Sequence, residues 1–268
     1  MFFFKYIQNN CSAYFFYDWI KLEYFFVFCA AFVGSGLKAV GGFGFATLTT
    51  PTVSLFWDVP TAIVVISIPT LATSFLNCWR AREAAKEGFS IFFPFFISSL
   101  IGLGVGLTIL LNMNPNLMKL ILGLYLVIQI SWEHFNHSET NKKESSLTRS
   151  IGMGGIAGLM LGTVGMPSHV IASYLTGMNL SKNRYLFILS STQVILRVTT
   201  IAFLQSRLIG KEVIGLTVVM FIPVILGFVV GTKIYKFLTD KIFFTIVKII
   251  ILLMGFALII RYLSQYLN

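Results

Sequence analysis

Charged side chains are scarce in this 268-residue sequence, because only 11% of its residues are Asp, Glu, Lys or Arg and only ten of these are acidic. A soluble domain carries about 25% charged residues. Thirty charged side chains are too few to cover the surface of an ordinary soluble enzyme of this length. An intrinsically disordered chain is excluded as well, because 56% of the residues are hydrophobic and disorder requires low hydrophobicity and high charge.

Cysteine and histidine are also rare, with three residues of each. Cys11, Cys29 and Cys78 form no CxxC motif, and an odd number of thiols, two of them in apolar stretches, argues against a disulfide framework. The sequence contains neither an HExxH motif nor a Walker loop. We therefore expect that the protein is not an enzyme and that it binds no metal and no other cofactor.

Apolar and basic residues are abundant instead. The mean hydropathy is +0.84 and the formal net charge is +10. This composition is typical of a polytopic helical membrane protein. In that class, Lys and Arg gather in cytoplasmic loops and meet anionic lipid headgroups. Nucleic-acid binding would need a polar basic face, which the sequence lacks, so we expect membrane lipid as a partner and a multi-pass location in the cell's inner (plasma) membrane.

Stretches without charge divide the chain into predicted membrane segments. Long spans are expected at 60–79, 89–111 and 117–132, and again at 185–206, 212–232 and 242–263. The tryptophans lie at the ends of uncharged stretches, as in the aromatic belts of membrane proteins. We predict an N-terminal leader at 1–21, a first membrane repeat at 22–132, a cytoplasmic polar linker at 133–149 and a second membrane repeat at 150–268.

Two apolar stretches are too long for one straight crossing. As single helices, residues 24–57 would run about 51 Å and residues 150–178 about 43 Å, whereas the hydrocarbon core of a membrane is about 30 Å thick. Each stretch contains a glycine-rich run, at 34–51 and at 152–167. We predict that each stretch forms two short helices that meet at a non-helical break.

The two halves of the chain also resemble each other. A constant offset of 129 residues, or 123 near the breaks, pairs several uncommon residues, namely Phe92 with Phe221, Pro94 with Pro223, Gly102 with Gly231, Lys119 with Lys248 and Gly42 with Gly165. The fold class expected is therefore an all-α polytopic membrane protein of two repeats, each with a glycine-broken pair of short helices and three spans, giving 8–10 membrane segments.

The relative orientation of the two repeats follows from the number of segments in each. Five segments per repeat give inverted repeats, whereas a broken pair that crosses only once gives parallel repeats. The basic residues are divided eleven to five between the two faces in both cases. The lengths of the broken segments favour inverted repeats.

The breaks are candidate substrate sites. Backbone groups freed from helical bonding cannot face lipid, so they line a protected cavity, and helix N-termini offer N–H groups and partial positive charge to anions. The alternative is that the glycines only allow close helix packing. Two breaks at matching positions favour a site, with Gly42, Gly44 and Thr47 at the first and Gly165, Pro167 and Ser168 at the second as its candidate residues.

Two basic residues lie inside the predicted segments. Lys38 lies in the first broken stretch and Arg197 lies thirteen residues into a span. A charge at such depth costs at least about 2.5–3.5 kcal/mol and usually serves a function. The alternatives are that Lys38 reaches the membrane surface and that Arg197 only binds backbone carbonyls. Because no acidic residue lies deep, we expect neither a cation site nor a carboxylate proton relay, and the positive groups indicate a small anionic substrate.

His169 is the last candidate site residue and lies four positions after Gly165. Histidine exchanges protons near neutral pH more readily than other side chains, but it can equally be a neutral hydrogen-bonding residue. Paired with Ser35 in the sequence Gly34-Ser35-Gly36, it leaves an intramembrane serine protease as an alternative function, although no further motif supports it. A non-transporting membrane scaffold is another alternative.

Several of these motifs resemble the TauE/SafE sulfite exporter family. The run GGFGFATLTTP at 41–51 is similar to the family's glycine-rich GFG…P signature, and the span and basic loop at 62–86 resemble those that follow it there. The run GTVGMPSHVIASYL at 162–175 resembles the family's G-x-x-G-P-P stretch, with departures at Met166, Ser168 and His169. Arg184 and Arg197 lie where many members carry basic residues. The resemblance covers about residues 22–262.

The resemblance implies about eight helices and a secondary transporter that exports small sulfur-containing anions, such as sulfite or sulfonates. The residues themselves point to a small-anion transporter independently. A homo-oligomer is compatible with the resemblance and with the residues themselves.

Overall fold

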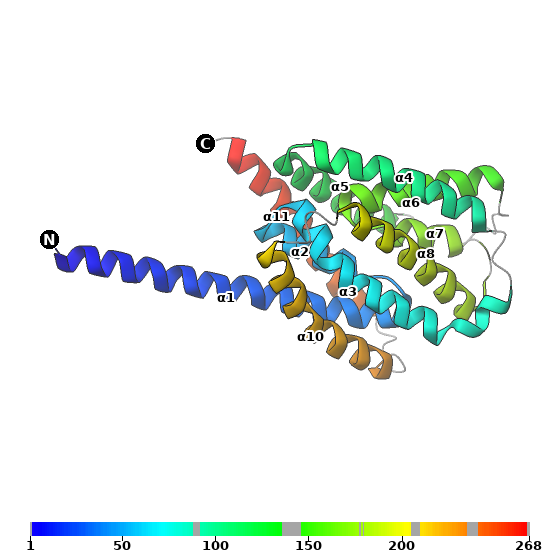
Figure 1. Ribbon diagram of the computed structural model, residues 1–268, viewed down its shortest axis with the longest axis horizontal. Coiled ribbons are helices and arrows are strands. Elements are labelled where there is room, and N and C mark those ends of the chain that lie inside the picture. The colour runs from blue at the N-terminus through cyan, green and yellow to red at the C-terminus, as the bar shows by residue number, and fades with distance from the viewer. Residues whose placement is uncertain are drawn as a thin grey trace.

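The computed structural model describes residues 2–87, 92–135, 146–176, 178, 180–204, 210–234 and 241–266. Within these ranges all regular structure is helical (Figure 1). The α-helices are α1 (Phe2–Gly41), α2 (Phe45–Phe56), α3 (Val59–Arg80), α4 (Phe93–Asn112), α5 (Pro115–Phe135), α6 (Leu147–Val164), α7 (Ser168–Thr176), α8 (Lys182–Phe203), α10 (Lys211–Ile234) and α11 (Lys241–Tyr266), and a 3-10 helix, η1, covers Arg82–Glu87.

Among the described residues, six helical stretches are long and apolar enough to cross a membrane, namely Leu22–Gly41, Val59–Arg80, Phe93–Asn112, Lys182–Phe203, Val213–Lys233 and Val247–Ser264. A shorter apolar stretch in α5 covers Pro115–Ser131. Large apolar side chains such as Ile101, Val218 and Ile222 are exposed on the outside of the bundle, where lipid would cover them. The prediction of an all-α polytopic membrane protein is confirmed.

Both long apolar stretches are broken inside the predicted glycine-rich runs. Residues 42–44 separate α1 from α2, and residues 165–167 separate α6 from α7. The backbone φ angle is +78° at Gly42, +111° at Gly44 and +77° at Gly165. Because residues with a Cβ atom rarely adopt a positive φ, these glycines allow the chain to leave the helix and turn.

The first broken pair folds back on itself. The ring of Phe26 in α1 stacks on Phe56 in α2 with 6.5 Å between centroids, and the rings of Tyr24 and Trp57 are 6.1 Å apart. Near the turn, Gly34 lies against the backbone of Phe45. The end of α2 therefore lies beside the middle of α1, and residues 22–56 form an antiparallel unit that we name the first hairpin.

The second broken pair folds back in the same way. The hydroxyls of Ser150, at the start of α6, and Tyr174, near the end of α7, are 2.7 Å apart. The guanidinium of Arg149 also lies over the Tyr174 ring, 5.8 Å from its centroid. Residues 147–176 are named the second hairpin. Neither broken pair therefore carries the chain across the bundle.

The two hairpins enter the bundle from opposite faces. Three helices, α3, α4 and α5, lie between them in the chain, and an odd number of crossings brings the start of the second hairpin to the face opposite the start of the first. The tips of the hairpins meet inside, where the rings of Phe43 and His169 are 5.7 Å apart. Figure 1 shows the start of α1 and the end of α11 toward the same end of the bundle.

Two helix pairs pack with their backbones in contact. A Cβ atom on Gly158 of α6 would collide with the Ser99 carbonyl of α4, and one on Gly231 of α10 would collide with the backbone of Gly36 in α1. Close packing, the alternative role left open for glycine, is therefore found at these helices, which we name the α4–α6 and α1–α10 seams. The glycines of the breaks have the separate role described above.

The seams connect the two halves of the chain. The first hairpin packs on α10, the second long span of the second half, and the second hairpin packs on α4, the second long span of the first half. Each hairpin therefore packs on the second long span of the opposite half of the chain. This reciprocal pattern is expected of inverted repeats. The internal repeat itself stays a prediction.

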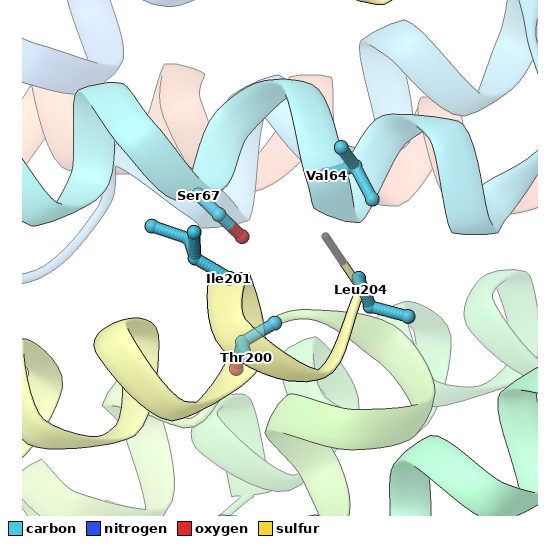
Figure 2. A pocket seen from close by; sticks show the side chains of 5 residues that line it. All are labelled: Val64, Ser67, Thr200, Ile201 and Leu204. Carbon is cyan, nitrogen blue, oxygen red and sulfur yellow. The ribbon is translucent and has the colours of Figure 1, made fainter. Parts of the chain in front are cut away.

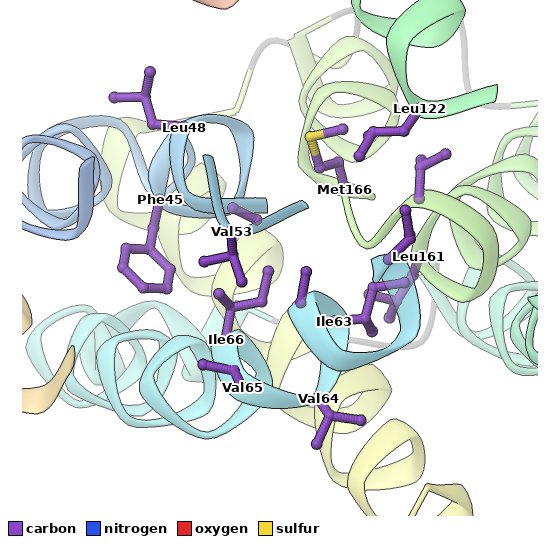
Figure 3. Close-up of a cluster of buried hydrophobic side chains, with 14 of the residues drawn as sticks. Phe45, Leu48, Val53, Ile63, Val64, Val65, Ile66, Leu122, Leu161 and Met166 are labelled. Atoms are coloured by element: carbon purple, nitrogen blue, oxygen red, sulfur yellow. The ribbon is translucent and has the colours of Figure 1, made fainter. Parts of the chain in front are cut away.

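A buried apolar core surrounds the hairpin tips (Figure 3). It joins Phe45 and Val53 of the first hairpin to Ile63 of α3, Leu122 of α5 and Leu161 of α6. These side chains are not solvent-accessible. The predicted leader at 1–21 is continuous with α1 from Phe2 onward, and most of the predicted linker at 133–149 lies outside the described residues, so the proposed boundaries stay predictions.

Candidate functional site

A polar stripe on α3 faces a polar pair on α8. Ser67, Thr70, Ser74 and Asn77 are buried and recur every three or four residues, which places them on one side of the helix. The Asp58 carboxylate caps α3 by accepting a hydrogen bond from the Thr61 N–H at 3.0 Å.

The facing pair on α8 consists of Gln193 and Arg197, which are four residues apart and therefore also lie on one side of their helix. The Ser181 hydroxyl caps α8 in the same manner, through the Arg184 N–H. Because α3 and α8 pack against each other, the stripe and the pair form one polar layer inside an apolar bundle.

Lys38 is 1% exposed and lies in this layer. Its ammonium donates hydrogen bonds to the Thr70 carbonyl at 2.9 Å and to the Ser74 hydroxyl at 2.7 Å. The alternative that Lys38 extends to the membrane surface is therefore wrong. The Asn77 amide donates to the Lys38 carbonyl at 3.1 Å, so α3 also holds the backbone of α1 just before the first break.

Arg197 is likewise 1% exposed. Its Nη1 donates to the Ser67 hydroxyl at 3.1 Å, and its Nη2 donates to the Gly165 carbonyl, in the second break, at 2.7 Å. Its Nε is buried without a hydrogen-bond partner among the described residues. The expected backbone carbonyl is present, but it satisfies only part of the guanidinium.

Gln193 connects the two hairpin tips. Its amide oxygen accepts a hydrogen bond from the Ser74 hydroxyl at 3.1 Å, and its amide nitrogen donates to the Gly42 carbonyl at 3.1 Å and to the Ser168 hydroxyl at 3.4 Å. Gln193, Ser67 and Ser74 were not among the candidates from the sequence. The three- and four-residue spacing of polar residues within uncharged spans was the available signal.

A second contact between the hairpins involves the predicted residues Thr47 and His169. The Thr47 hydroxyl lies 2.9 Å from Nε2 of His169, and either atom can donate according to the tautomer. The His169 ring meets the edge of Phe43. Thr47 is buried and His169 is half-buried, so this pair lies at the border of the polar layer.

The layer carries uncompensated positive charge. Among the described residues, Lys38 and Arg197 donate only to neutral hydroxyl and carbonyl oxygens, and their charges repel each other. Burying a charge is costly unless an opposite charge or several hydrogen bonds compensate it. Two buried cations with only neutral partners among the described residues therefore make this layer the candidate site for an anion.

The comparison with protein families agrees with this chemistry. The family model described as sulfite exporter TauE/SafE matches residues 26–258, which include most of the first hairpin, the whole second hairpin and both buried cations. The chain belongs to the TauE/SafE family. No curated protein and no solved structure matches the chain. The family is one of membrane transporters, so the resemblance seen in the sequence is confirmed.

Two further candidates of this TauE/SafE member shape the breaks without contacting the cations. The Gly44 carbonyl accepts from the Leu48 N–H at 3.3 Å, which starts α2, and the Pro167 carbonyl accepts from the Ile171 N–H at 3.1 Å, which starts α7. These residues orient the first turns of the two short helices.

A small crevice lies between α3 and α8 (Figure 2). Val64, Ser67, Thr200, Ile201 and Leu204 line it, and it is too narrow to hold a water molecule. The Ser67 hydroxyl that lines the crevice is the group that accepts from Arg197. In this TauE/SafE member the crevice therefore ends one hydrogen bond away from the buried guanidinium.

The serine of the protease alternative lies in a different contact. The Ser35 hydroxyl donates to the Phe32 carbonyl of its own helix at 3.0 Å and faces Gly227 in the α1–α10 seam, whereas Nε2 of His169 bonds to Thr47. Neither contact supports a Ser–His catalytic pair in this TauE/SafE protein.

Proposed function

We propose that this protein is a secondary transporter that exports a small sulfur-containing or organic anion, of the sulfite or sulfonate class, across the inner membrane. Arg197 carries the proposal: it is buried, it bonds only to neutral oxygens, and its Nε has no partner among the described residues. The other predicted site residues, Lys38 and the two breaks, lie in the same polar layer.

The donors of the layer suit an oxyanion. A guanidinium presents a planar fork that matches the oxygens of sulfonate-like groups, and an ammonium adds a compact charge. The Ser67, Ser74 and Ser168 hydroxyls and the Gln193 amide add neutral donors. No carboxylate is hydrogen-bonded to Lys38 or Arg197 among the described residues, so the site offers no charged acceptor to an acidic proton. A sulfonate, which carries no such proton at neutral pH, therefore suits the site better than inorganic phosphate.

The two hairpins provide a basis for alternating access. A transporter closes its site toward one side at a time, commonly around a fixed midplane site formed by broken helices. Here each face has its own hairpin, and both tips contact the polar layer through Gln193. Withdrawal of one tip would open the layer to one face while the other hairpin keeps the opposite face closed.

The distribution of basic residues favours one orientation of the site in the membrane. The ends of α3 and α5 lie on the face with the larger share of Lys and Arg, as expected of the cytoplasmic face. Lys38 bonds α3 nearer that face, at Ser74, and Arg197 bonds it nearer the other, at Ser67. An exported anion would therefore meet Lys38 first and then Arg197.

Liposomes containing the purified protein would test this function. We expect flux of sulfite or of an organic sulfonate such as sulfoacetate, with sulfate as a third oxyanion and phosphate as the comparison that is carried least. Protein-free liposomes give the leak. Absence of flux for all three sulfur oxyanions would contradict the proposal, and peptide cleavage by the same preparation would instead support the protease alternative.

A further inference from the structure

We propose that Gln193 is the third side chain that contacts the transported anion, and that it holds the two hairpin tips together while the site is empty. The inference rests on the proposed anion transport and adds to it a substrate-contacting residue and a link between binding and hairpin movement.

The position of Gln193 supports a direct contact. It precedes Arg197 by four residues, so both side chains project from the same side of α8. Its amide oxygen accepts from the Ser74 hydroxyl, which itself accepts from the Lys38 ammonium. An anion that binds Lys38 at this position therefore lies next to the Gln193 amide.

The two cations lie at different depths, and Gln193 lies at the depth of Lys38. Arg197 bonds α3 at Ser67, whereas Lys38 bonds it at Thr70 and Ser74, and Gln193 bonds it at Ser74. Three to seven residues of α-helix separate these positions, which is a rise of about 5–10 Å. An anion at the depth of Lys38 therefore has both the ammonium and the Gln193 amide as donors before it reaches Arg197.

The present partners of the Gln193 amide nitrogen are replaceable. One N–H donates to the Gly42 carbonyl of the first hairpin at 3.1 Å, and the other reaches the Ser168 hydroxyl of the second hairpin at 3.4 Å. An anionic oxygen is a stronger acceptor than a hydroxyl, because a charge-assisted hydrogen bond is about twice as strong as a neutral one. Binding of the anion would release the Ser168 contact and so remove one of the links between the tips, the other being the Thr47–His169 contact.

This exchange gives the anion a means of shifting the conformation. A ligand changes a conformational equilibrium only through contacts that differ between the two states. Gln193 would bond both tips in the empty state and the anion in the loaded state, so the presence of the anion would determine whether Gln193 links the tips.

Gln193→Glu is the central test because it places a carboxylate of nearly the same shape beside the Lys38 ammonium and four residues before Arg197 on α8. The fixed carboxylate would take the place of the anion. We expect sulfite affinity to fall at least about tenfold, by loss of a charge-assisted contact, while the melting temperature without sulfite rises. Both would be measured by thermal unfolding of detergent-purified protein titrated with sodium sulfite, and flux in liposomes should fall in parallel.

Gln193→Met removes the amide but keeps the length of the side chain. We expect weaker sulfite binding together with a lower melting temperature, because both tips lose a partner. Thr192→Val is the matched control: the Thr192 hydroxyl is buried but bonds only its own helix, at the Ile188 carbonyl, so this variant should bind sulfite like the wild type.

The outcomes separate the inference from the proposed function. Wild-type binding together with unchanged affinity in Gln193→Glu would overturn the role of Gln193 and leave the proposed function intact. A lower melting temperature in Gln193→Glu with unchanged affinity would assign Gln193 a purely structural role and also overturn the inference. A wild type that neither binds nor transports sulfite, sulfate or sulfoacetate would overturn both.

Discussion

At the scale of single residues, the site depends on two cations that no acidic side chain neutralises in the described part of the chain. Lys38 and Arg197 were identifiable from the sequence, because a charge within an apolar segment is conspicuous and costly. Gln193 was not, since a neutral amide carries no comparable cost and its importance lies in its contacts with Gly42 and Ser168, which are distant in the sequence.

Transport should be impaired less when Arg197 is replaced by a residue that keeps the positive charge than when the charge is removed. Arg197→Lys keeps the charge but not the planar fork, so we expect a folded protein with weak transport. Arg197→Gln should fold and lose affinity for the anion by about ten- to a hundredfold, which corresponds to the roughly 1.5–3 kcal/mol of a hydrogen bond to a charged group. Anion titrations of both purified variants would measure this. Normal binding by a less stable Arg197→Gln would show a structural role instead.

Transport can depend on pH through the protein or through protonation of the substrate. We expect that His169 is responsible for any pH dependence of transport that arises from the protein. Sulfonate substrates stay ionised across the neutral range, so their flux excludes protonation of the substrate as the cause. Any pH dependence of sulfonate flux in the wild type should disappear in His169→Gln, which retains hydrogen bonding to Thr47 without titration. Thr47→Val, which keeps the imidazole but removes its hydrogen-bond partner, is the control. A pH dependence that persists in His169→Gln would exclude the histidine as the relay.

At the scale of elements, the glycines have two distinct functions. Those with positive φ turn the chain at the hairpin tips, whereas those of the α4–α6 and α1–α10 seams bring backbones together. The sequence predicted the breaks because glycine clusters interrupt stretches too long for one crossing. It could not show that each broken pair folds back, because that depends on contacts such as Phe26 with Phe56 and Ser150 with Tyr174.

The α4–α6 seam should be sensitive to the addition of a single methyl group. Gly158→Ala places a Cβ against the backbone of Ser99 and Leu103, and overpacking of this kind costs about 1–3 kcal/mol or more. Gly152→Ala in the same helix meets no atom within 4 Å and should be neutral or slightly stabilising. Thermal unfolding of both variants would measure the difference, and equal stability would contradict the close packing.

At the scale of the whole molecule, the fold-back of both broken pairs bears on the orientation of the two halves. Basic-residue counts could not distinguish inverted from parallel repeats, because both arrangements gave the same division. With two hairpins that do not cross and three helices between them, the halves start from opposite faces, as the inverted arrangement requires.

The same topology predicts that the end of the chain lies outside the cytoplasm. After the second hairpin, α8, α10 and α11 cross three times from the cytoplasmic face, and Arg261 near the end of α11 bonds the Leu55 carbonyl at the end of the first hairpin. A reporter active only outside the cytoplasm and fused after Asn268 should therefore be active. A reporter active only in the cytoplasm serves as the control, and activity of that control alone would contradict the topology.

The α1–α10 seam also imposes an order on biosynthesis. The first hairpin is made at the beginning of synthesis, but the helix that covers its glycine face, α10, follows only after α3 to α8 have been made. Until then Gly36 must face lipid or a temporary neighbour. The glycine face of the first hairpin therefore stays uncovered until α10 has been inserted. If translation stops before α10, the inserted part of the chain exposes this face. Membrane chaperones and proteases could recognise such an insertion intermediate.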